Sequence, residues 1–255
     1  FQYFFCIVGQ YMAQIAIREY DAKRMLASYA SSPYLWYLIE WEEDIVCFSE
    51  NSLNTTWIIK PDQLFGKRGK YGLLWVNLNN ANICKWWKEH FQKDTIIGKQ
   101  VRKLTTFLVE PFIPHSEEYY LAIKTERECD VIYFSHAWGI DIEENWETVK
   151  ELRIPLFVIP SEMEESLSSP IMRKKVLSSH KMNSKGILVG WQNLQDSIIN
   201  TFKISDSRIV DFIIQLYSFF REYGFVYLEV NPFTIDSFGN IVCLDMVARV
   251  DDSEA

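Results

Sequence analysis

The stretch that decides the fold lies near the end of the chain: Tyr227-Leu-Glu-Val-Asn-Pro-Phe-Thr-Ile-Asp-Ser-Phe-Gly-Asn-Ile-Val-Cys-Leu-Asp245. Its two ends are apolar and rich in β-forming residues, and residues 236–240 between them have turn chemistry. The pattern therefore predicts a β-hairpin. If the turn is symmetric about Phe238, Asn231 lies directly opposite Asp245, with the two side chains on one face of the strand pair.

The same arithmetic predicts a candidate metal site. Side chains alternate along a strand, so Glu229 shares the face of Asn231 and Asp245. An amide oxygen and two carboxylates then converge at one end of a sheet. Hard oxygen ligands of this kind suit Mg²⁺, which takes one or two carboxylates plus water and substrate phosphates. The alternative is a solvent-exposed hairpin face, on which acidic residues need no ligand.

Composition limits the class of protein. With 255 residues, 48% of them hydrophobic, the chain can bury the core of one large or two small domains. The net charge of −8 argues against a nucleic-acid partner, which needs a basic surface. The five cysteines are scattered without a CxxC pair, which is typical of reduced thiols in a cytoplasmic protein.

The first residues give no targeting signal. Residues 1–11 are apolar but lack the basic start and cleavage site of a signal peptide, and they are too short to span a bilayer. Because Met12 is a plausible natural start, we interpret residues 1–11 as an extension of doubtful relevance. No other segment approaches ~20 consecutive apolar residues, so we expect a soluble protein without a membrane partner.

The first half of the chain shows short elements. Apolar and charged residues alternate at helical spacing over Ile17–Leu26, which predicts an amphipathic helix. The aromatic run Trp36–Trp41 is predicted to lie in the core. Trp57–Ile59 predicts a strand that stops at Lys60-Pro61, because proline cannot continue a ladder. Trp86–Phe91 is typical of a surface helix with its tryptophans packed inward.

The second half alternates strands with one long helix. Phe107–His115 predicts a buried strand that runs into a proline-rich connector, whose free backbone groups could meet an adenine edge. Tyr119–Ile123 and Val131–Phe134 are further strand candidates. Residues 205–207 offer a helix cap, apolar residues follow at helical spacing, and Gly224 predicts the end of that helix. Residues 160–186 carry no clear pattern.

A glycine-rich basic segment, Gly66-Lys-Arg-Gly-Lys-Tyr-Gly72, follows the strand at Trp57. Glycines allow backbone N–H groups to turn toward a ligand, and cations neutralise phosphate, so the segment is a candidate lid over a polyphosphate. It does not match the P-loop pattern. A solvated basic turn is the alternative.

Four motifs, which occur in this order along the chain, are similar to those of a known protein family: Ile17-Arg-Glu-Tyr-Asp-Ala-Lys-Arg24, Lys60-Pro-Asp-Gln-Leu-Phe-Gly-Lys-Arg-Gly-Lys70, Val109-Glu-Pro-Phe-Ile-Pro-His-Ser116 and Tyr227-Leu-Glu-Val-Asn-Pro232. They closely resemble the ATP-grasp half of the ATP-citrate lyase family and, more distantly, the β subunit of succinyl-CoA synthetase. The resemblance runs from about Met12 to Asp251. It implies an ATP-grasp fold of α+β class, in which two lobes close on ATP.

The resemblance also implies lobe boundaries and site residues. The N-terminal lobe would span 12–106, the C-terminal lobe with the metal-binding hairpin 107–247, and residues 248–255 would begin a linker to a citrate-binding domain that is missing here. ATP and Mg²⁺ would be the cofactors. The implied roles are phosphate binding for Lys60, Arg68 and the backbone of Gly69, adenine contact for Glu110, Pro111 and Ile113, ribose contact for Glu118, Mg²⁺ binding for Asn231 and Asp245, and contact with a phosphorylated histidine loop for Glu229.

The histidine that accepts phosphate is not expected in this chain. None of its four histidines, which are His90, His115, His136 and His180, stands in a glycine-rich loop at a helix start. The resemblance therefore implies a partner, the synthetase α-like large subunit that carries the phosphohistidine. Citrate and CoA would be substrates of the complex.

One segment departs from the family pattern. Relatives carry Glu-Gly-Gly where this chain has Ala137-Trp138-Gly139. The change removes a carboxylate and adds a large ring near the implied site, without touching the metal or phosphate ligands.

Three functions remain open at this point. The first is the ATP-binding part of a citrate-cleaving enzyme that makes acetyl-CoA and oxaloacetate. The second is a citryl-CoA or succinyl-CoA synthetase, which shares the ATP site but makes an acyl-CoA without cleavage. The third, motivated by Ala137-Trp138, is a nucleotide-binding assembly module without catalysis. The word that begins at Lys60 favours the first.

Overall fold

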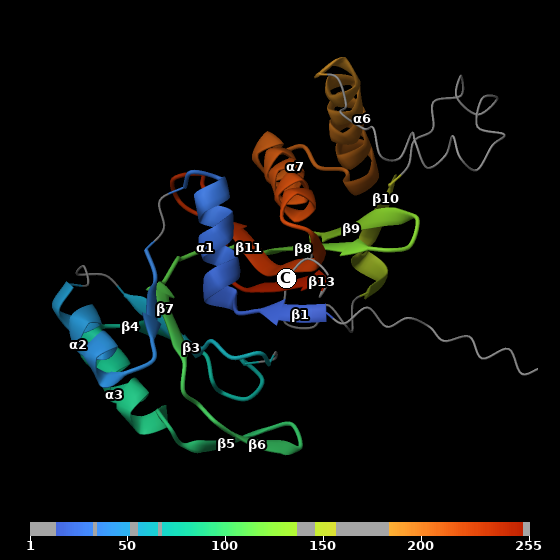
Figure 1. Cartoon of the computed structure of the whole chain (residues 1–255). Helices are drawn as coiled ribbons and strands as arrows, with labels where there is room; N and C mark the ends of the chain where they lie inside the picture. Colours follow the sequence, from blue (N-terminus) through green and yellow to red (C-terminus); the bar gives the residue numbers. More distant parts are fainter. Residues whose placement is uncertain are drawn as a thin grey trace, which may run out of the picture.

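Two antiparallel sheets organise the protein, each covered by its own helices (Figure 1). The computed structural model describes residues 14–32, 35–51, 56–65, 68–136, 146–156 and 184–251. The sheets meet along α1, β7 and β13, so the chain forms a large and a small lobe with one junction between them.

The large sheet combines the two ends of the described chain. Its strands, in order across the sheet, are β1 (Gln14–Ile17), β13 (Met246–Asp251), β11 (Phe225–Ile235), β8 (Tyr119–Thr125), β9 (Cys129–Ser135) and β10 (Lys150–Pro155), and β12 (Ile241–Cys243) pairs with β11. A 3₁₀ turn, η2 (Trp146–Thr148), leads into β10. Among the described strands β1 pairs with β13 alone, which puts β1 at the edge of this sheet.

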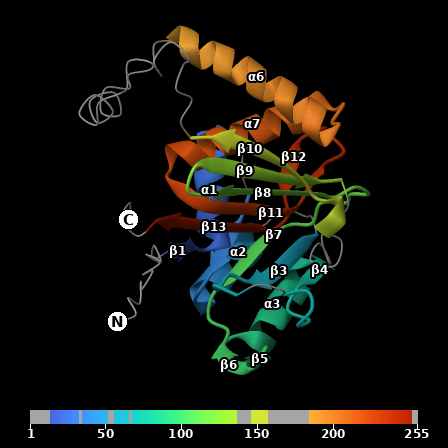
Figure 2. The same ribbon diagram turned by 90° about the vertical axis from the view of Figure 1, so that its right-hand side faces the viewer.

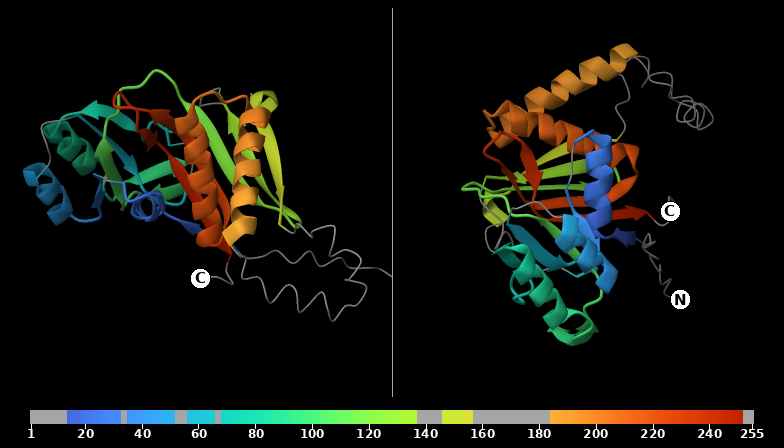
Figure 3. Two further views of the ribbon diagram at one scale, coloured as in Figure 1. Left: turned by 90° about the horizontal axis from the view of Figure 1, so that it is seen from above. Right: turned by 90° about the vertical axis from the view of Figure 1, so that its left-hand side faces the viewer.

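Three helices cover one face of this sheet: α1 (Glu19–Tyr29), α6 (Ser184–Phe202) and α7 (Ser207–Glu222). Figures 2 and 3 show α6 and α7 side by side above the strands. The carboxylate of Asp206 accepts from the Arg208 N–H and begins α7. The buried apolar face of α7 then packs into the core of the large lobe. Gly224, with φ of +66°, lets the chain leave the helix for β11.

The small lobe has a four-stranded sheet, ordered β2 (Tyr37–Ile39), β7 (Phe107–Pro111), β3 (Trp57–Pro61) and β4 (Trp75–Leu78). Helices α2 (Glu42–Asn51) and α3 (Asn80–His90) pack against it, and the hairpin of β5 (Asp94–Ile97) and β6 (Gln100–Lys103) extends from its end (Figure 1). Trp57, Trp86 and Trp87 are buried in its core, and for Trp86 and Trp87 this confirms the predicted inward packing.

The predicted lobe boundaries need correction. β7 was assigned to a C-terminal lobe that begins at 107, but it lies between β2 and β3 in the small sheet. β1 was assigned to the N-terminal lobe, but it pairs with β13 in the large sheet, and β13 continues to Asp251, beyond the predicted end at 247. Strand partners decide sheet membership, and each of these strands finds its partner far along the chain.

Most predicted elements are confirmed, although the aromatic run Trp36–Trp41 is only partly so. The predicted helices at Ile17, Trp86 and after Ser205 are present as α1, α3 and α7. In the aromatic run, Ile39 is buried but Trp41 is 63% exposed. The predicted core position of Trp41 is therefore wrong. Residues 1–13 and 157–183 lie outside the described part of the chain.

The hairpin has the predicted register. Phe233 pairs with Cys243, Ile235 with Ile241, and the Asn231 N–H donates to the carbonyl oxygen of Asp245 at 3.0 Å. The turn is closed by the Asp236 carboxylate, which accepts from two backbone N–H groups, and by Gly239, whose φ is +87°.

We expect Gly239→Ala to destabilise the protein by about 1 kcal/mol or more, because an L side chain is strained at a positive φ. Urea denaturation of both proteins measures the change. Ser237→Ala, at an exposed position in the same turn, is the control and should stay within about 0.5 kcal/mol of wild type. Equal stabilities for the two variants would contradict the turn geometry.

Candidate functional site

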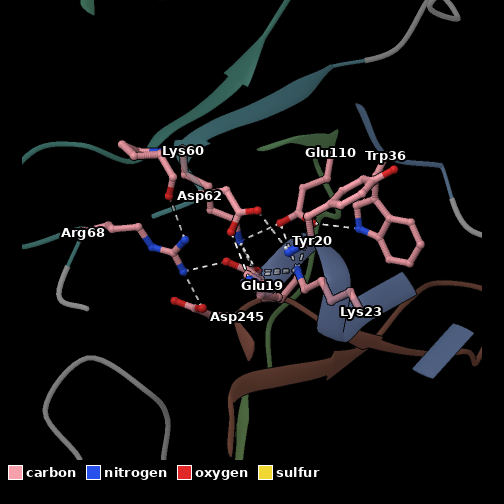
Figure 4. A network of polar contacts seen from close by, with 11 residues as sticks. Glu19, Tyr20, Lys23, Trp36, Lys60, Asp62, Arg68, Glu110 and Asp245 are labelled. Carbon is pink, nitrogen blue, oxygen red and sulfur yellow. Dashed lines mark hydrogen bonds and ion pairs between the residues drawn. The ribbon is translucent and has the colours of Figure 1, made fainter. Parts of the chain in front are cut away.

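A buried cluster of charged side chains joins the two lobes (Figure 4). The large lobe supplies Glu19 and Lys23 from α1 and Asp245 from the link between β12 and β13. The small lobe supplies Lys60 from β3, Glu110 from β7, and Asp62 and Arg68 from the segment after β3. Four of the predicted site residues, Lys60, Arg68, Glu110 and Asp245, are thus brought together.

Glu19 is the centre of the cluster. Its Oε1 lies 2.6 Å from Lys60 Nζ and 2.7 Å from Lys23 Nζ, and its Oε2 lies 2.6 Å from Arg68 Nη2. The last contact is an ion pair without hydrogen-bond geometry, since Oε2 accepts no hydrogen bond within the described residues. Glu19 is 4% exposed. One carboxylate therefore holds cations from both lobes.

Glu110 is the second buried carboxylate between the same cations. Its oxygens lie 2.8 Å from Lys23 Nζ and 2.7 Å from Lys60 Nζ, and Trp36 Nε1 donates to Oε2 at 3.1 Å. Both lysines also donate to the carbonyl oxygen of Leu244, at 3.1 and 2.7 Å. The two ammonium groups are thus bound by acceptors that come from both sheets.

Arg68 is a buried residue, although the sequence places it in a candidate lid. Its Nη1 donates to the carbonyl oxygen of Pro61 at 3.0 Å, and its Nη2 contacts Asp245 Oδ1 at 2.5 Å in addition to Glu19. The guanidinium, which belongs to the candidate lid segment 66–72, therefore lies between the carboxylates of Glu19 and Asp245.

Asp62 connects the lobes through backbone groups. Its carboxylate accepts from the N–H groups of Glu19 at 3.0 Å and Tyr20 at 3.3 Å, so a small-lobe side chain satisfies the free donors at the start of α1. A negative charge at a helix N-terminus is also favourable to the helix dipole. A cavity of about 140 Å³ opens here, lined in part by Arg18, Arg68 and Val247.

The charges of the cluster shift the pKa values of its carboxyl groups in opposite directions. Burial raises the pKa of Glu19, but Arg68, Lys23 and Lys60 outweigh it and hold that pKa well below its usual value. For Asp62, burial and the charge of Glu19 raise the pKa to about 6, against the opposing effects of the Tyr20 N–H and two arginines. Glu19 is therefore ionised at neutral pH, and Asp62 titrates just below neutrality.

The side-chain oxygen of Asn231, one of the two predicted metal ligands, has the chemistry that a cation site needs. Asn231 Oδ1 is buried and has no hydrogen-bond partner within the described residues, while its Nδ2 donates to Glu229 Oε1 at 3.3 Å. An unsatisfied oxygen across the strand pair from Asp245 suits a hard cation. No group of three His, Cys, Asp or Glu arranged for a metal is present in the described residues.

The remaining predicted nucleotide-binding residues make none of the ion pairs of the cluster among the described residues. Gly69 is in the turn that follows Arg68. Gly66 and Lys67, which precede Arg68 in the candidate lid, lie outside the described residues. Pro111 ends β7. The ring of His115 contacts the carbonyl oxygen of Ile113 at 2.6 Å and Glu118 Oε1 at 2.8 Å. These contacts order the connector predicted to meet the nucleotide base and ribose.

Sequence analysis missed four members of the cluster, namely Glu19, Lys23, Trp36 and Asp62. The sequence predicts Glu19 and Lys23 only as charged positions of an amphipathic helix, with no role at the site. The signal that could have found them is the motif Ile17–Arg24. It contributes to the family resemblance, but no functional role was assigned to its residues. Ala137, Trp138 and His180, which the sequence analysis singled out, lie outside the described residues.

Comparison with family models and with solved structures together gives the fold as ATP-grasp. ATP citrate lyase from Methanothrix soehngenii, solved in complex with citrate and coenzyme A, superposes with a TM-score of 0.67 at 30% identity, over 95% of this chain and 52% of that one. An acetyl-coenzyme A synthetase from Ca. Korarchaeum cryptofilum, with a TM-score of 0.57 and 17% identity, supports the fold alone. The fold implies that the domain uses ATP.

Sequence comparison then gives the family. The model of the ATP-citrate synthase ATP-grasp domain matches residues 13–193, and the chain belongs to that family. ATP-citrate synthase alpha chain protein 2 of rice is 34% identical over an alignment of 253 residues, which covers 96% of this chain and 53% of the rice protein. Human ATP-citrate synthase is 31% identical over 201 residues, only 16% of its length. The chain thus spans about half of the rice relative and a small part of the longer human one.

The length and composition of the helices bear on membrane insertion. In the described part of the chain, no helix is both long enough and apolar enough to cross a membrane.

The raised pKa of Asp62 predicts a pH-dependent stability. A folded-state pKa of about 6, against 3.8 unfolded, means that protonated Asp62 stabilises the fold below pH 3.8 and that this contribution is lost as pH rises through 6. Each ten-fold difference in proton affinity between the folded and unfolded states corresponds to ~1.4 kcal/mol, so the contribution is up to about 3 kcal/mol. Asp62→Asn cannot titrate. The stability difference between wild type and the variant, measured by denaturation from pH 4 to 7, should change in favour of the variant as pH rises, and parallel curves would contradict the assignment.

Proposed function

We propose that this chain is the ATP-binding portion of an ATP-citrate lyase. The complete enzyme uses Mg·ATP to phosphorylate a histidine on a partner chain, and then cleaves citrate with CoA to acetyl-CoA and oxaloacetate in the cytoplasm. The single observation that carries the proposal is the cluster around Glu19, where Lys60, Arg68 and Asp245 converge between the lobes of an ATP-grasp fold.

In this proposal Lys60 and Arg68 bind the outer phosphates of ATP, with the Gly69 backbone beside them. Both cations are neutralised by carboxylates within the chain, and Arg68 contacts Asp245 directly. Phosphate would therefore replace Asp245 as the partner of Arg68. The exchange frees the Asp245 carboxylate at the moment when a metal accompanies the nucleotide.

Asn231 and Asp245 would hold the Mg²⁺ ion. When bound there, the cation would neutralise negative charge that develops during phosphoryl transfer. The unsatisfied Oδ1 of Asn231 and the displaced carboxylate of Asp245 supply the two protein ligands. In the same proposal, Glu229 meets the loop of the partner that carries the acceptor histidine.

The connector after β7 would receive the rest of the nucleotide. Pro111 and Ile113 are placed at the adenine, and Glu118 at the ribose hydroxyls. His115 holds Glu118 and the Ile113 carbonyl oxygen in fixed positions. Glu110 is also assigned to adenine contact in this proposal, and its buried carboxylate is held by Trp36, Lys23 and Lys60.

Asp245→Ala should weaken ATP binding at least about ten-fold in the presence of Mg²⁺, because even indirect metal partners cost that much when removed. Without Mg²⁺ the loss should be smaller, since the metal contact is absent. Calorimetric titration with MgCl₂ and with EDTA measures both. Asp21→Ala, which removes a half-buried carboxylate paired with Arg18, is the matched control. An unchanged Mg²⁺ dependence in Asp245→Ala would remove the metal assignment.

This chain alone should transfer no phosphate to its own histidines. His90 packs on Trp86, His115 contacts Glu118, and His136 contacts the Phe202 carbonyl oxygen, so none of the three histidines that the structure describes is presented to the cluster. Incubation with γ-labelled ATP, first alone and then with the synthetase α-like partner, tests the division of labour. We expect label on the partner's histidine only, and less of it with Glu229→Gln. Label on this chain would overturn the proposal.

A further inference from the structure

Tyr227, Glu229 and Asn231 form a row along β11, on the sheet face away from the helices. Their neighbours Leu228 and Val230 point into the core of the large lobe, so the three alternate residues share the opposite face. The Tyr227 hydroxyl donates to Glu229 Oε2 at 2.6 Å, and Asn231 Nδ2 donates to Glu229 Oε1 at 3.3 Å. Each oxygen of Glu229 therefore has one donor.

This row fixes which way the amide of Asn231 faces. The NH₂ group of the Asn231 amide faces Glu229, because its Nδ2 donates to the Oε1 of that carboxylate. The amide oxygen is then turned away from Glu229, where it is buried without a partner among the described residues. A phenol keeps its proton at neutral pH, because its ordinary pKa is about 10, so Tyr227 remains a donor to the carboxylate.

The backbone around Asn231 is fixed as well. Its N–H donates to the Asp245 carbonyl oxygen, which holds the two predicted metal ligands across from each other. On the other side, the register with β8 shifts between Val230 and Phe233, so Asn231 lies at an irregularity of the ladder. Irregularities of this kind re-aim side chains near functional sites. The orientation of the amide then depends on its side-chain contact with Glu229.

We propose that Tyr227 is a positioning residue for the metal: acting through Glu229, it holds Asn231 Oδ1 toward a divalent cation that binds with the nucleotide. The inference rests on the proposed function, because it needs a cation at Asn231 and Asp245. Partners that orient a metal ligand typically change metal affinity 10–100-fold when they are lost. Tyr227 is itself held in place, with the Arg249 guanidinium 5.6 Å from its ring centre.

The test is Tyr227→Phe, which removes one hydroxyl and leaves the charge of Glu229 in place. ATP is titrated into the chain with EDTA and at a series of MgCl₂ concentrations. We expect the Mg²⁺ concentration needed for tight ATP binding to rise about ten-fold. ATP affinity in EDTA should not change. If both quantities stay as in wild type, Tyr227 does not position the metal ligand.

Tyr217→Phe is the matched control. The Tyr217 hydroxyl donates to Asp130 Oδ2 at 3.0 Å on the opposite face of the same sheet, so the substitution removes the same kind of bond away from the cluster. It should lower the free energy of unfolding and leave the Mg²⁺ dependence unchanged. If Tyr227→Phe behaves like Tyr217→Phe, the hydroxyl is only structural and the inference is wrong.

A double-mutant cycle tests the route through Glu229. In a Glu229→Ala background Tyr227→Phe should have almost no further effect on the Mg²⁺ dependence, because the link to Asn231 is already gone. Additive losses would overturn the route. If the wild-type chain binds ATP with no Mg²⁺ dependence, the proposed metal site itself fails, a result distinct from a normal wild type with an unaffected Tyr227→Phe.

Discussion

The ion pairs of Glu19 hold the two lobes of this domain together. One buried carboxylate contacts Lys23 on its own helix and Lys60 and Arg68 from the other lobe. Removing one partner of such a cluster leaves an uncompensated charge in a dry environment, which typically costs about 3–5 kcal/mol. The lobe arrangement and the candidate nucleotide site therefore depend on the same contacts, and neither can change without the other.

A second consequence concerns what a ligand must displace. The cluster pairs three cations, Lys23, Lys60 and Arg68, with the carboxylates of Glu19, Glu110 and Asp245, so its positive groups are neutralised before any phosphate arrives. A bound nucleotide gains only the difference between its own contacts and the internal ones. In return the cations are already oriented and desolvated, which lowers the entropic cost of forming the site.

Sequence reasoning succeeded where local chemistry decides the outcome. The turn residues 236–240 determine the hairpin register, and with it the pairing of Asn231 and Asp245. It failed where burial is decided by a distant segment. The local sequence pattern does not predict that the side chains of Glu19 and Lys23 are buried, because charged residues are equally typical of a solvent-exposed helix face. For the same reason the sequence of β7 does not indicate which sheet the strand joins, because a buried strand has the same composition in either lobe.

The pairing of the first and last described strands has a consequence for biosynthesis. β1 pairs with β13 and, within the described residues, with no other strand, so this edge of the large sheet cannot be completed until residues 246–251 have been translated. Domains are made from the N-terminus at ~5–20 residues per second, so residues 14–17 wait many seconds for their partner. During that interval the start of α1, and with it Glu19, has no finished sheet beside it. The cluster that unites the lobes is thus among the last features to assemble on a nascent chain.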